Sequence, residues 1–361
     1  GKPSMSSDTK TATSYEDGLK GASEKVAEFK ETKSALKRLQ HWLHMTPSAV
    51  PMIVLIVALI IFGLLSPNFF KALTLSTILQ QIAIVGILGC AQSLVILTAG
   101  IDLSVGAIAV FSSVLMGQFT FRYGIPAPLA IAAGLALGTA MGFANGWLIA
   151  KVKLPPFIVT LGTWQIILSA NYIFSANETI RSSEIAERAA SLQFWGNAIQ
   201  PGGIKVLYAV FLMVALVALL AYVLRHTAWG RHVYAVGDDP DAAELAGVQT
   251  KRILIQVYAL AGLFCAIAGW VMIGRFGSVS PSASTGQLGN IQSITAVVIG
   301  GISLFGGRGS IVGMFFGALI VGVFEMGLKM VGTDPQWTFF LIGMLIILAV
   351  AVDQWIRKAS A

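Results

Sequence analysis

Long apolar blocks separated by short polar stretches make up most of the chain after residue 46. Between residues 51 and 150 the charged side chains are Lys71, Asp102 and Arg122. A stretch of this kind suits a bilayer, because each helical crossing takes about 20 apolar residues and pairs its own backbone N–H and C=O groups. We therefore expect an all-α integral membrane protein with about ten transmembrane helices, some of them broken or re-entrant.

The apolar blocks predict ten spans, and eight to eleven are compatible with the pattern. Clusters of Gly, Ser and Pro and the charged residues set their limits. The predicted spans are residues 51–66, 78–98, 103–121, 128–150, 157–174, 206–224, 253–273, 291–304, 311–328 and 337–355. Small residues repeat within the blocks, for example Gly134, Gly138 and Gly142, and they predict close helix packing.

Composition excludes a soluble domain. The chain has 361 residues, of which 56% are hydrophobic and 11% charged, whereas soluble domains carry about 25% charged residues. The net charge of +7 comes from basic residues scattered along loops and the N-terminal region, so no nucleic-acid partner is expected. Cys90 and Cys265 fall in apolar segments, and neither a metal site nor a disulfide is expected.

The distribution of positive charge predicts the orientation. Of the 24 Lys and Arg residues, eight lie in residues 1–46, nine in predicted inner loops and the C-terminus, and seven in predicted outer loops. This bias has the sign of the positive-inside rule. We expect both termini in the cytoplasm and the chain in a bacterial inner membrane, with the polytopic domain at 47–357 and a tail at 358–361.

Residues 1–46 are expected to form a cytoplasmic leader. Residues 1–4 precede Met5, fit an expression remnant, and are left out of the fold. Apolar residues at near-helical spacing among lysines predict an amphipathic helix suited to membrane lipid, with a partly disordered leader as an equal alternative. These apolar residues are Val26, Phe29, Leu36, Leu39 and Leu43.

Residues 225–252 form a polar interruption between two long apolar blocks. Asp238, Asp239 and Asp241 stand at the start of a short helix expected at 240–246, where carboxylates can cap free N–H groups. Pro240 suits the first helical position and Gly247 suits the stop. From composition alone the segment is either a solvated connector or a small helix that transmits motion at the membrane surface.

Two glycine-containing stretches predict helix breaks. GIDLSVG at 100–106 places the lone carboxylate of Asp102 amid apolar sequence, where it should cap a helix, face a cavity or contact substrate. GISLFGG at 301–307 repeats it weakly. Paired broken helices are typical of transport sites, with coincidence in a glycine-rich chain as the alternative. The candidate residues for a translocation path or helix break are Gln92, Gly100, Asp102, Ser104, Gln292 and Ser303.

Four stretches, in the same order, resemble signature segments of the sugar permeases of ATP-binding cassette importers, of the ribose, arabinose, xylose, galactose and fructose type. They are AGIDLSVG (99–106), PPFIVTLGT (155–163), WGRHVYAVGDDPDAAELAGV (229–248) and VIGGISLFGGRGS (298–310). The resemblance covers about residues 47–357. It implies a homodimeric or paired permease, a separate cytoplasmic ATPase and a periplasmic sugar-binding protein.

The resemblance also implies an ATPase-docking loop at residues 225–252, in which Asp241, Ala242, Ala243 and Gly247 match the family motif. Asp238-Asp239 replaces the Gly-Asn of many relatives, which leaves the capping group open. The chain contains no phosphate-binding loop, so we expect a transport subunit that is not an enzyme and binds no cofactor, with ATP and Mg on the partner ATPase. The full predicted coupling set is Asp238, Asp239, Asp241, Ala242, Ala243, Glu244 and Gly247.

The expected function is ATP-driven import of a ribose- or fructose-like monosaccharide through a path between two copies of the chain, without a tight sugar site. The rival is a proton-coupled secondary transporter that uses Asp102 or Glu325 as the titrating group. A non-transporting membrane scaffold is a third alternative. Glu325 and Lys329 stand four residues apart on a predicted helix and are expected to form a structural ion pair.

Overall fold

The computed structural model describes residues 17–20 and 35–358, and the chain divides into two compact units, Pro47–Asp353 and Gly1–Thr46 with Gln354–Ala361. In the smaller unit, α2 (Ala35–Met45) exposes Leu36 and Leu39 and buries Leu43. The first positions of the predicted amphipathic helix, Val26 and Phe29, lie outside the described residues.

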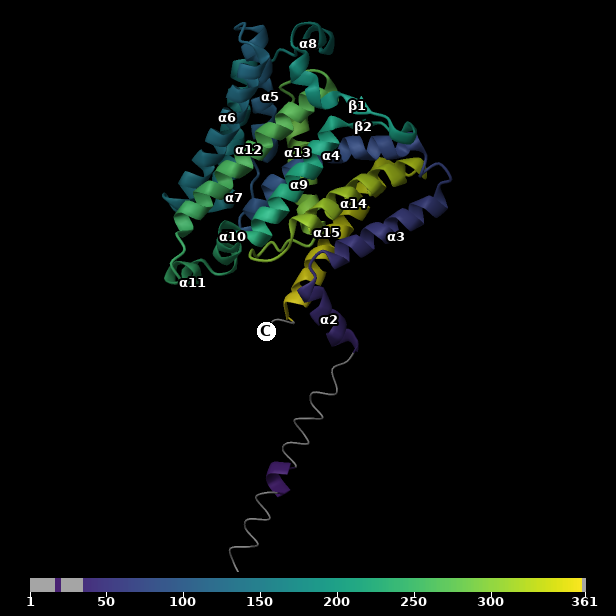
Figure 1. The fold of residues 1–361 in the computed structure, drawn as a ribbon, viewed down its shortest axis with the longest axis vertical. Helices are drawn as coiled ribbons and strands as arrows, with labels where there is room; N and C mark the ends of the chain where they lie inside the picture. The colour runs from purple at the N-terminus through teal and green to yellow at the C-terminus, as the bar shows by residue number, and fades with distance from the viewer. Residues whose placement is uncertain (1–16, 21–34, 359–361) are drawn as a thin grey trace, which may run out of the picture. The chain divides into compact units, whose positions relative to one another are not determined.

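The larger unit is built from helices (Figure 1). One helix lies at each of the ten predicted spans, which confirms the all-α membrane fold. These helices are α3 (Ala49–Leu65), α4 (Ala72–Leu97), α5 (Val105–Phe121), α6 (Ala127–Ala150), α7 (Pro156–Ser175), α9 (Tyr208–His226), α12 (Thr250–Phe276), α13 (Ala283–Ile299), α14 (Ile311–Met330) and α15 (Pro335–Arg357).

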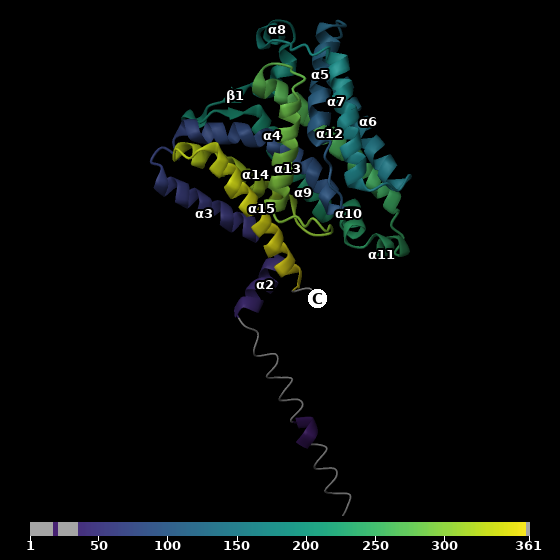
Figure 2. The same cartoon turned by 180° about the vertical axis from the view of Figure 1, so that it is seen from behind.

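Shorter elements connect these helices. Between α7 and α9 lie α8 (Ser182–Arg188), the 3-10 helices η1 (Ala190–Gly196) and η2 (Pro201–Gly203), and an antiparallel hairpin of β1 (Ala198–Ile199) and β2 (Val206–Leu207). Between α9 and α12 lie α10 (Ala228–Asp238) and α11 (Pro240–Leu245). Figures 1 and 2 show α8 and α11 at opposite ends of the larger unit.

Not every helix is long enough to cross a bilayer. Among the described residues, seven helices are long and apolar enough to span a membrane, namely α4, α6, α7, α9, α12, α14 and α15. The helices α3, α5 and α13 have 17 residues each, or roughly 26 Å at 1.5 Å per residue, short of the ~30 Å hydrocarbon thickness. Two of them, α5 and α13, adjoin a break, so the expectation of broken spans is confirmed.

The core of the larger unit lies around α4 and α12. Of the 18 most apolar consecutive residues in each helix, 83% are buried in α4 and 6% in α15. α4 contacts α12, α13, α14 and α9, while α15 presents large apolar side chains such as Trp337 and Phe339 on its outside. A helix that is apolar all round belongs either in a packed interior or against lipid, and the two helices exemplify the two cases.

The small residues permit a close helix crossing between α6 and α12. A Cβ added to Gly262 would lie 2.9 Å from the Cα of Gly142, and a Cβ added to Gly142 would lie 2.9 Å from the Cα of Gly262. The two backbones are therefore in contact, as small residues in membrane helices allow.

Several element boundaries differ from the prediction. α4 begins at Ala72 instead of residue 78, because hydroxyls near its start bond back within the helix, Ser76 Oγ to Ala72 O at 2.7 Å and Thr77 Oγ1 to Leu73 O at 2.9 Å. α13 covers Ala283–Ile299, so the span predicted at 291–304 was wrong at both ends.

Two local predictions also fail. The polar composition of residues 228–238 predicts a loop, yet they form α10, whose first turn is capped by the hydroxyl of Thr227. The described ion pairs within 4 Å do not include Glu325–Lys329. The Glu325 carboxylate instead lies 3.4 Å from the amide nitrogen of Gln292 on α13.

The α6–α12 crossing gives a stability prediction. Replacing Gly262 by Leu should force the two backbones apart and cost about 1–3 kcal/mol or more, as overpacking does. Among the described residues, a Cβ added to Gly162 on α7 would meet no atom within 4 Å beyond its chain neighbours and the nearby backbone of its own helix. Gly162→Leu is therefore the matched control. Thermal unfolding midpoints in detergent should fall clearly for Gly262→Leu and stay near wild type for Gly162→Leu. Equal midpoints would contradict the contact.

Candidate functional site

The break between α4 and α5 lies inside the larger unit. After α4 the backbone of Ala99 is left-handed, with φ of 64°, and Gly100 N–H donates to Val95 O at 3.1 Å, which closes the helix end. Asp102 follows and is 1% exposed. Its Oδ1 accepts from the Ser104 N–H at 2.8 Å and from the Ser104 hydroxyl at 2.6 Å. The carboxylate therefore shapes the turn that leads into α5.

Gln92 of α4 holds this turn from the helix before it. Its Oε1 accepts from the Asp102 N–H at 3.0 Å, and its Nε2 donates to the Asp102 carbonyl at 2.8 Å. Backbone groups released from a helix inside an apolar bundle have no water to bond to, and each one left unpaired costs free energy. One side-chain amide thus satisfies both backbone groups of the residue at the centre of the break.

Two asparagines hold the same break from neighbouring helices. Asn290 of α13 accepts from the Gly106 N–H at 2.7 Å and donates to the Leu103 carbonyl at 2.6 Å. Asn145 of α6 donates to the Ser104 hydroxyl at 3.0 Å. The start of α5 is therefore fixed to α6 and α13 by buried polar contacts.

The break between α13 and α14, residues 300–310, is built in the same way. Gly301 has φ of 84°, and Ile302 N–H donates to Val297 O at 3.2 Å, which closes the end of α13. The buried hydroxyl of Ser303 then accepts from the Phe305 N–H at 3.2 Å. Ser303 repeats the turn geometry of Asp102 with a neutral side chain, so the weak sequence echo corresponds to a shared local structure.

The two breaks are in direct contact. Gly307 N–H in the second break donates to the carbonyl of Leu97, the last residue of α4, at 2.9 Å. A Cβ on Gly306 would lie 2.9 Å from the Ala99 nitrogen. Segments about 200 residues apart in the sequence thus meet backbone to backbone.

The end of α10 lies on this contact. A Cβ on Gly237 would collide with the Leu97 carbonyl oxygen and lie 2.7 Å from the Gly307 nitrogen. The Tyr234 hydroxyl donates to the Gly309 carbonyl at 2.5 Å. Burial raises the pKa of Tyr234 to about 12, so the phenol stays protonated and remains a donor at neutral pH. We call this meeting of α4, α10 and residues 300–310 the junction.

The short helix α11 follows the junction directly. Of the three aspartates at its start, Asp239 is the cap, because its Oδ1 accepts from the Ala242 N–H at 3.1 Å. Asp238 is the last residue of α10, and Asp241 is exposed in the first turn of α11. Gly247 has φ of 95°, a conformation that favours glycine after a helix.

The two faces of α11 differ sharply. Leu245 is 91% exposed, whereas Ala243 is 5% exposed. Ala242, Glu244 and Leu245 all lie on the exposed side. An apolar side chain held out from an acidic helix is suited to insert into a partner's pocket, and no pattern in the sequence singles out Leu245.

The structure therefore brings most of the sequence-predicted residues together and separates one. Gln92, Asp102 and Ser104 form one bonded cluster, and Ser303 lies in the second break. Gln292 lies elsewhere, beside Glu325. Sequence reasoning missed Asn145, Asn290, Gly237 and Leu245. For the asparagines a signal existed, since an amide within an apolar span needs a buried partner.

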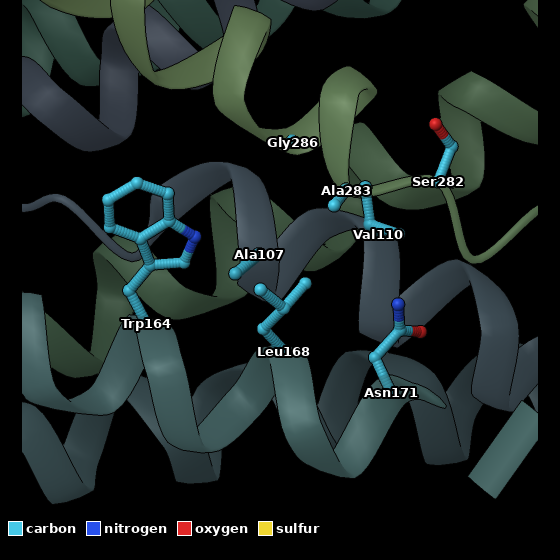
Figure 3. Close-up of a pocket in the computed structure, with 8 residues that line it drawn as sticks. All are labelled: Ala107, Val110, Trp164, Leu168, Asn171, Ser282, Ala283 and Gly286. Atoms are coloured by element: carbon cyan, nitrogen blue, oxygen red, sulfur yellow. The ribbon is translucent and has the colours of Figure 1, made fainter. Parts of the chain in front are cut away.

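A small pocket lies where α5, α7 and the start of α13 meet. Figure 3 shows Trp164, Leu168 and Asn171 extending from α7 toward Ala107 and Val110 of α5. Its volume is about 10 Å³, which is room for about one water molecule. This pocket is too small for an organic substrate. Within residues 17–20 and 35–358, no group of three His, Cys, Asp or Glu side chains is placed to hold a metal ion.

Comparison with known proteins identifies the family. The family described as "Branched-chain amino acid transport system / permease component" matches residues 74–350, which include both helix breaks, α10 and α11. The chain belongs to this permease family. Its helices and breaks are accordingly those of a multi-pass membrane transport subunit.

Individual relatives cover nearly the whole permease. The fructose import permease protein FrcC of Rhizobium meliloti is 62% identical over 349 residues, 96% of each chain. The ribose import permease protein RbsC of Escherichia coli K12 is 36% identical over 312 residues, 86% of this chain and 94% of that one. The galactose/methyl galactoside import permease protein MglC of Haemophilus influenzae is 33% identical over 313 residues, 82% and 92% of the two chains.

The first break gives a prediction for the permease. Gln92→Leu should leave the N–H and C=O of Asp102 buried without partners and cost about 1–3 kcal/mol. Gln336 is exposed near the start of α15, so Gln336→Leu is the control. In detergent, the unfolding midpoint of Gln92→Leu should fall and that of Gln336→Leu should not. If Gln92→Leu melts like wild type, the amide does not hold the break.

Proposed function

We propose that this permease is the membrane subunit of an ATP-binding cassette importer that carries a monosaccharide, with fructose as the preferred sugar. The observation that carries the proposal is the 62% identity to a fructose import permease over 96% of both chains. The identities to the ribose and galactose permeases are lower, at 36% and 33%. Ribose and galactose are therefore the comparison substrates.

In this proposal the permease lies in the bacterial inner membrane with both termini in the cytoplasm. The excess of Lys and Arg in the predicted inner segments supports that orientation. In Figures 1 and 2, α8 and α11 lie at opposite ends of the larger unit. This separation is compatible with the proposed orientation, in which the two helices would lie on opposite sides of the membrane. The periplasmic end, near α8, would receive sugar from a binding protein that supplies the affinity.

The cytoplasmic ATPase would dock on α11. The exposure of Leu245 and Ala242, and the acidic residues Asp241 and Glu244 beside them, support this assignment. The ATPase would bind ATP and Mg²⁺, because the permease sequence contains no phosphate-binding loop. The permease would work as a pair of copies, with the sugar path between them.

Docking on α11 would reach the transport path through the junction. α11 begins directly where α10 ends, and Gly237 of α10 lies against Leu97 of α4 and Gly307 of the second break. A shift of α11 would therefore move both helix breaks together, as a rigid-body switch. The atoms nearest to a Cβ on Gly237 are backbone atoms of Leu97 and Gly307, so little of the displacement would be lost in rotamer changes.

The proposal is tested on the permease purified as a complex with its co-expressed ATPase and binding protein. Fructose should stimulate ATP hydrolysis, and reconstituted vesicles with internal ATP should accumulate it; ribose and galactose should do so more weakly. Uptake in ATP-depleted vesicles driven by an imposed pH gradient would instead favour a proton-coupled transporter.

A second prediction concerns α11. Leu245→Asp should remove an apolar contact with the ATPase and cost about 2 kcal/mol or more of docking free energy, which lowers ATP-coupled uptake more than ~10-fold. Because Leu245 is 91% exposed, the substitution should leave the amount of permease in the membrane unchanged. Ala242→Lys should act in the same way.

The controls separate docking from folding. Leu245→Met keeps an apolar side chain and should retain uptake. Ala243→Lys is a poorer test than Ala242→Lys, because Ala243 is 5% exposed and a charge there also disturbs local packing. Normal uptake by both Leu245→Asp and Ala242→Lys would end the docking assignment.

A further inference from the structure

A second cavity lies in the larger unit, beside α13. Its volume is about 220 Å³, compared with the ~10–15 Å³ that a single water needs. Its walls come from α4, α12, α13 and α14. The polar residues that line it are Gln81, Arg275, Thr285, Gln292 and Glu325. Phe276 and Leu288 are exposed apolar residues at its mouth. The cavity can hold a small organic molecule.

The polar groups of this cavity offer both donors and acceptors. Within the described part of the chain, the buried side-chain oxygen of Gln81 has no hydrogen-bond partner. Gln292 Nε2 lies 3.4 Å from Glu325 Oε1, a long contact that a ligand can replace. Arg275 donates to Gln80 at 3.3 Å through one nitrogen, and its guanidinium has five N–H donors in all. A ligand that carries several groups able both to donate and to accept would satisfy this set.

The charges in the cavity balance. Arg275 contributes a positive charge and Glu325 a negative one, so the formal sum favours a neutral ligand over an anion or a cation. Phe276 is exposed at the rim, with the Arg275 guanidinium 5.7 Å from its ring centre. A polar wall beside an aromatic face suits a sugar ring, which has hydroxyls on its edge and C–H groups on its face.

The cavity lies in the half of the bundle far from α11. α12 begins at Thr250, shortly after α11, and Arg275 stands at its other end. Its 27 residues span roughly 40 Å at 1.5 Å per residue. In the proposed orientation the cavity is therefore in the periplasmic half. It is also formed between helices of the two halves that each contain a break, where transporters commonly place their substrate.

We infer that this cavity is a low-affinity monosaccharide site, at which Gln81, Gln292, Glu325 and Arg275 bind sugar hydroxyls on the periplasmic side of the junction. The inference rests on the proposed function. It assigns to the permease itself a share of the sugar selection, in addition to that of the binding protein. Weak binding is required there, because a site that held the sugar tightly would slow its release.

The test uses the full chain in lipid nanodiscs with a reporter thiol at the mouth. Leu288 lines the cavity and is 52% exposed, so Leu288→Cys leaves every polar group in place. Cys90 and Cys265 are buried and serve as the unreactive background. Glu244→Cys, on the exposed side of α11, is the control thiol. The rate of maleimide labelling is measured with fructose, ribose or galactose, and with glycine betaine, which has no hydroxyl, at equal osmolarity.

A site with a dissociation constant of about 1 mM is roughly 90% occupied at about 10 mM sugar, so labelling of Leu288→Cys should slow about ten-fold. Labelling of Glu244→Cys should not change with sugar, and glycine betaine should protect neither thiol. Adding Glu325→Gln or Arg275→Gln to Leu288→Cys should abolish protection while leaving the sugar-free labelling rate unchanged, which shows that the fold is intact.

The outcome is separable from that of the proposed function. If none of the three sugars slows labelling of Leu288→Cys more than that of Glu244→Cys, the sugar site is overturned, even where the complete importer takes up fructose. If protection persists in both double variants, the assigned polar groups are wrong. Failure of the complete importer to take up any of the three sugars would overturn the proposed function, whatever the labelling result.

Discussion

A main-chain hydrogen bond joins the two helix breaks of the permease, from the Gly307 N–H to the Leu97 carbonyl. Each break releases backbone groups into an apolar interior, where each group left unpaired costs free energy. The breaks can exist only because those groups find partners in one another, in Gln92, and in Asn290 of a neighbouring helix. These hydrogen bonds also fix the position of one half of the bundle relative to the other at the junction.

The junction explains why glycine is required at the end of α10. Any side chain at Gly237 would collide with the Leu97 carbonyl, so only glycine lets the α10 backbone reach both breaks. Because the contacts are between backbones, little adjustment is available through side-chain rotamers. The exposed helix α11 is thus connected to the buried breaks through α10, by contacts between backbone atoms.

The sequence predicted the class of fold well, because charge depletion over about 300 residues has few explanations other than a bilayer. It also located α11, since Asp239, Pro240 and Gly247 are strong local signals for a helix start and stop. The start of α4 and the limits of α13 were missed because Ser, Thr, Gln and Asn read as loop residues, yet inside a bundle their side chains bond back to a helix or across to a neighbour.

Contacts between distant segments could not be predicted in this way. The pairing of Gln92 with Asp102 spans ten residues and could have been suspected, but that of Asn290 with Gly106 spans 184. Gln92 and Gln292 look equivalent in sequence, and yet the first holds a break while the second lines a cavity with Glu325. Sequence similarity between two segments therefore does not determine which residues each segment contacts in the fold.

The backbone contact between Gly237 and residues 300–310 has a consequence for recombination among relatives. A chimaera that exchanges residues 225–252 alone would place a foreign α10 against a surface shaped by another parent's second break. That surface offers main-chain atoms, whose positions depend on the whole turn rather than on one adjustable side chain. Under the proposed docking of the ATPase on α11, an importer re-engineered to accept a different ATPase would therefore need both segments from the same parent.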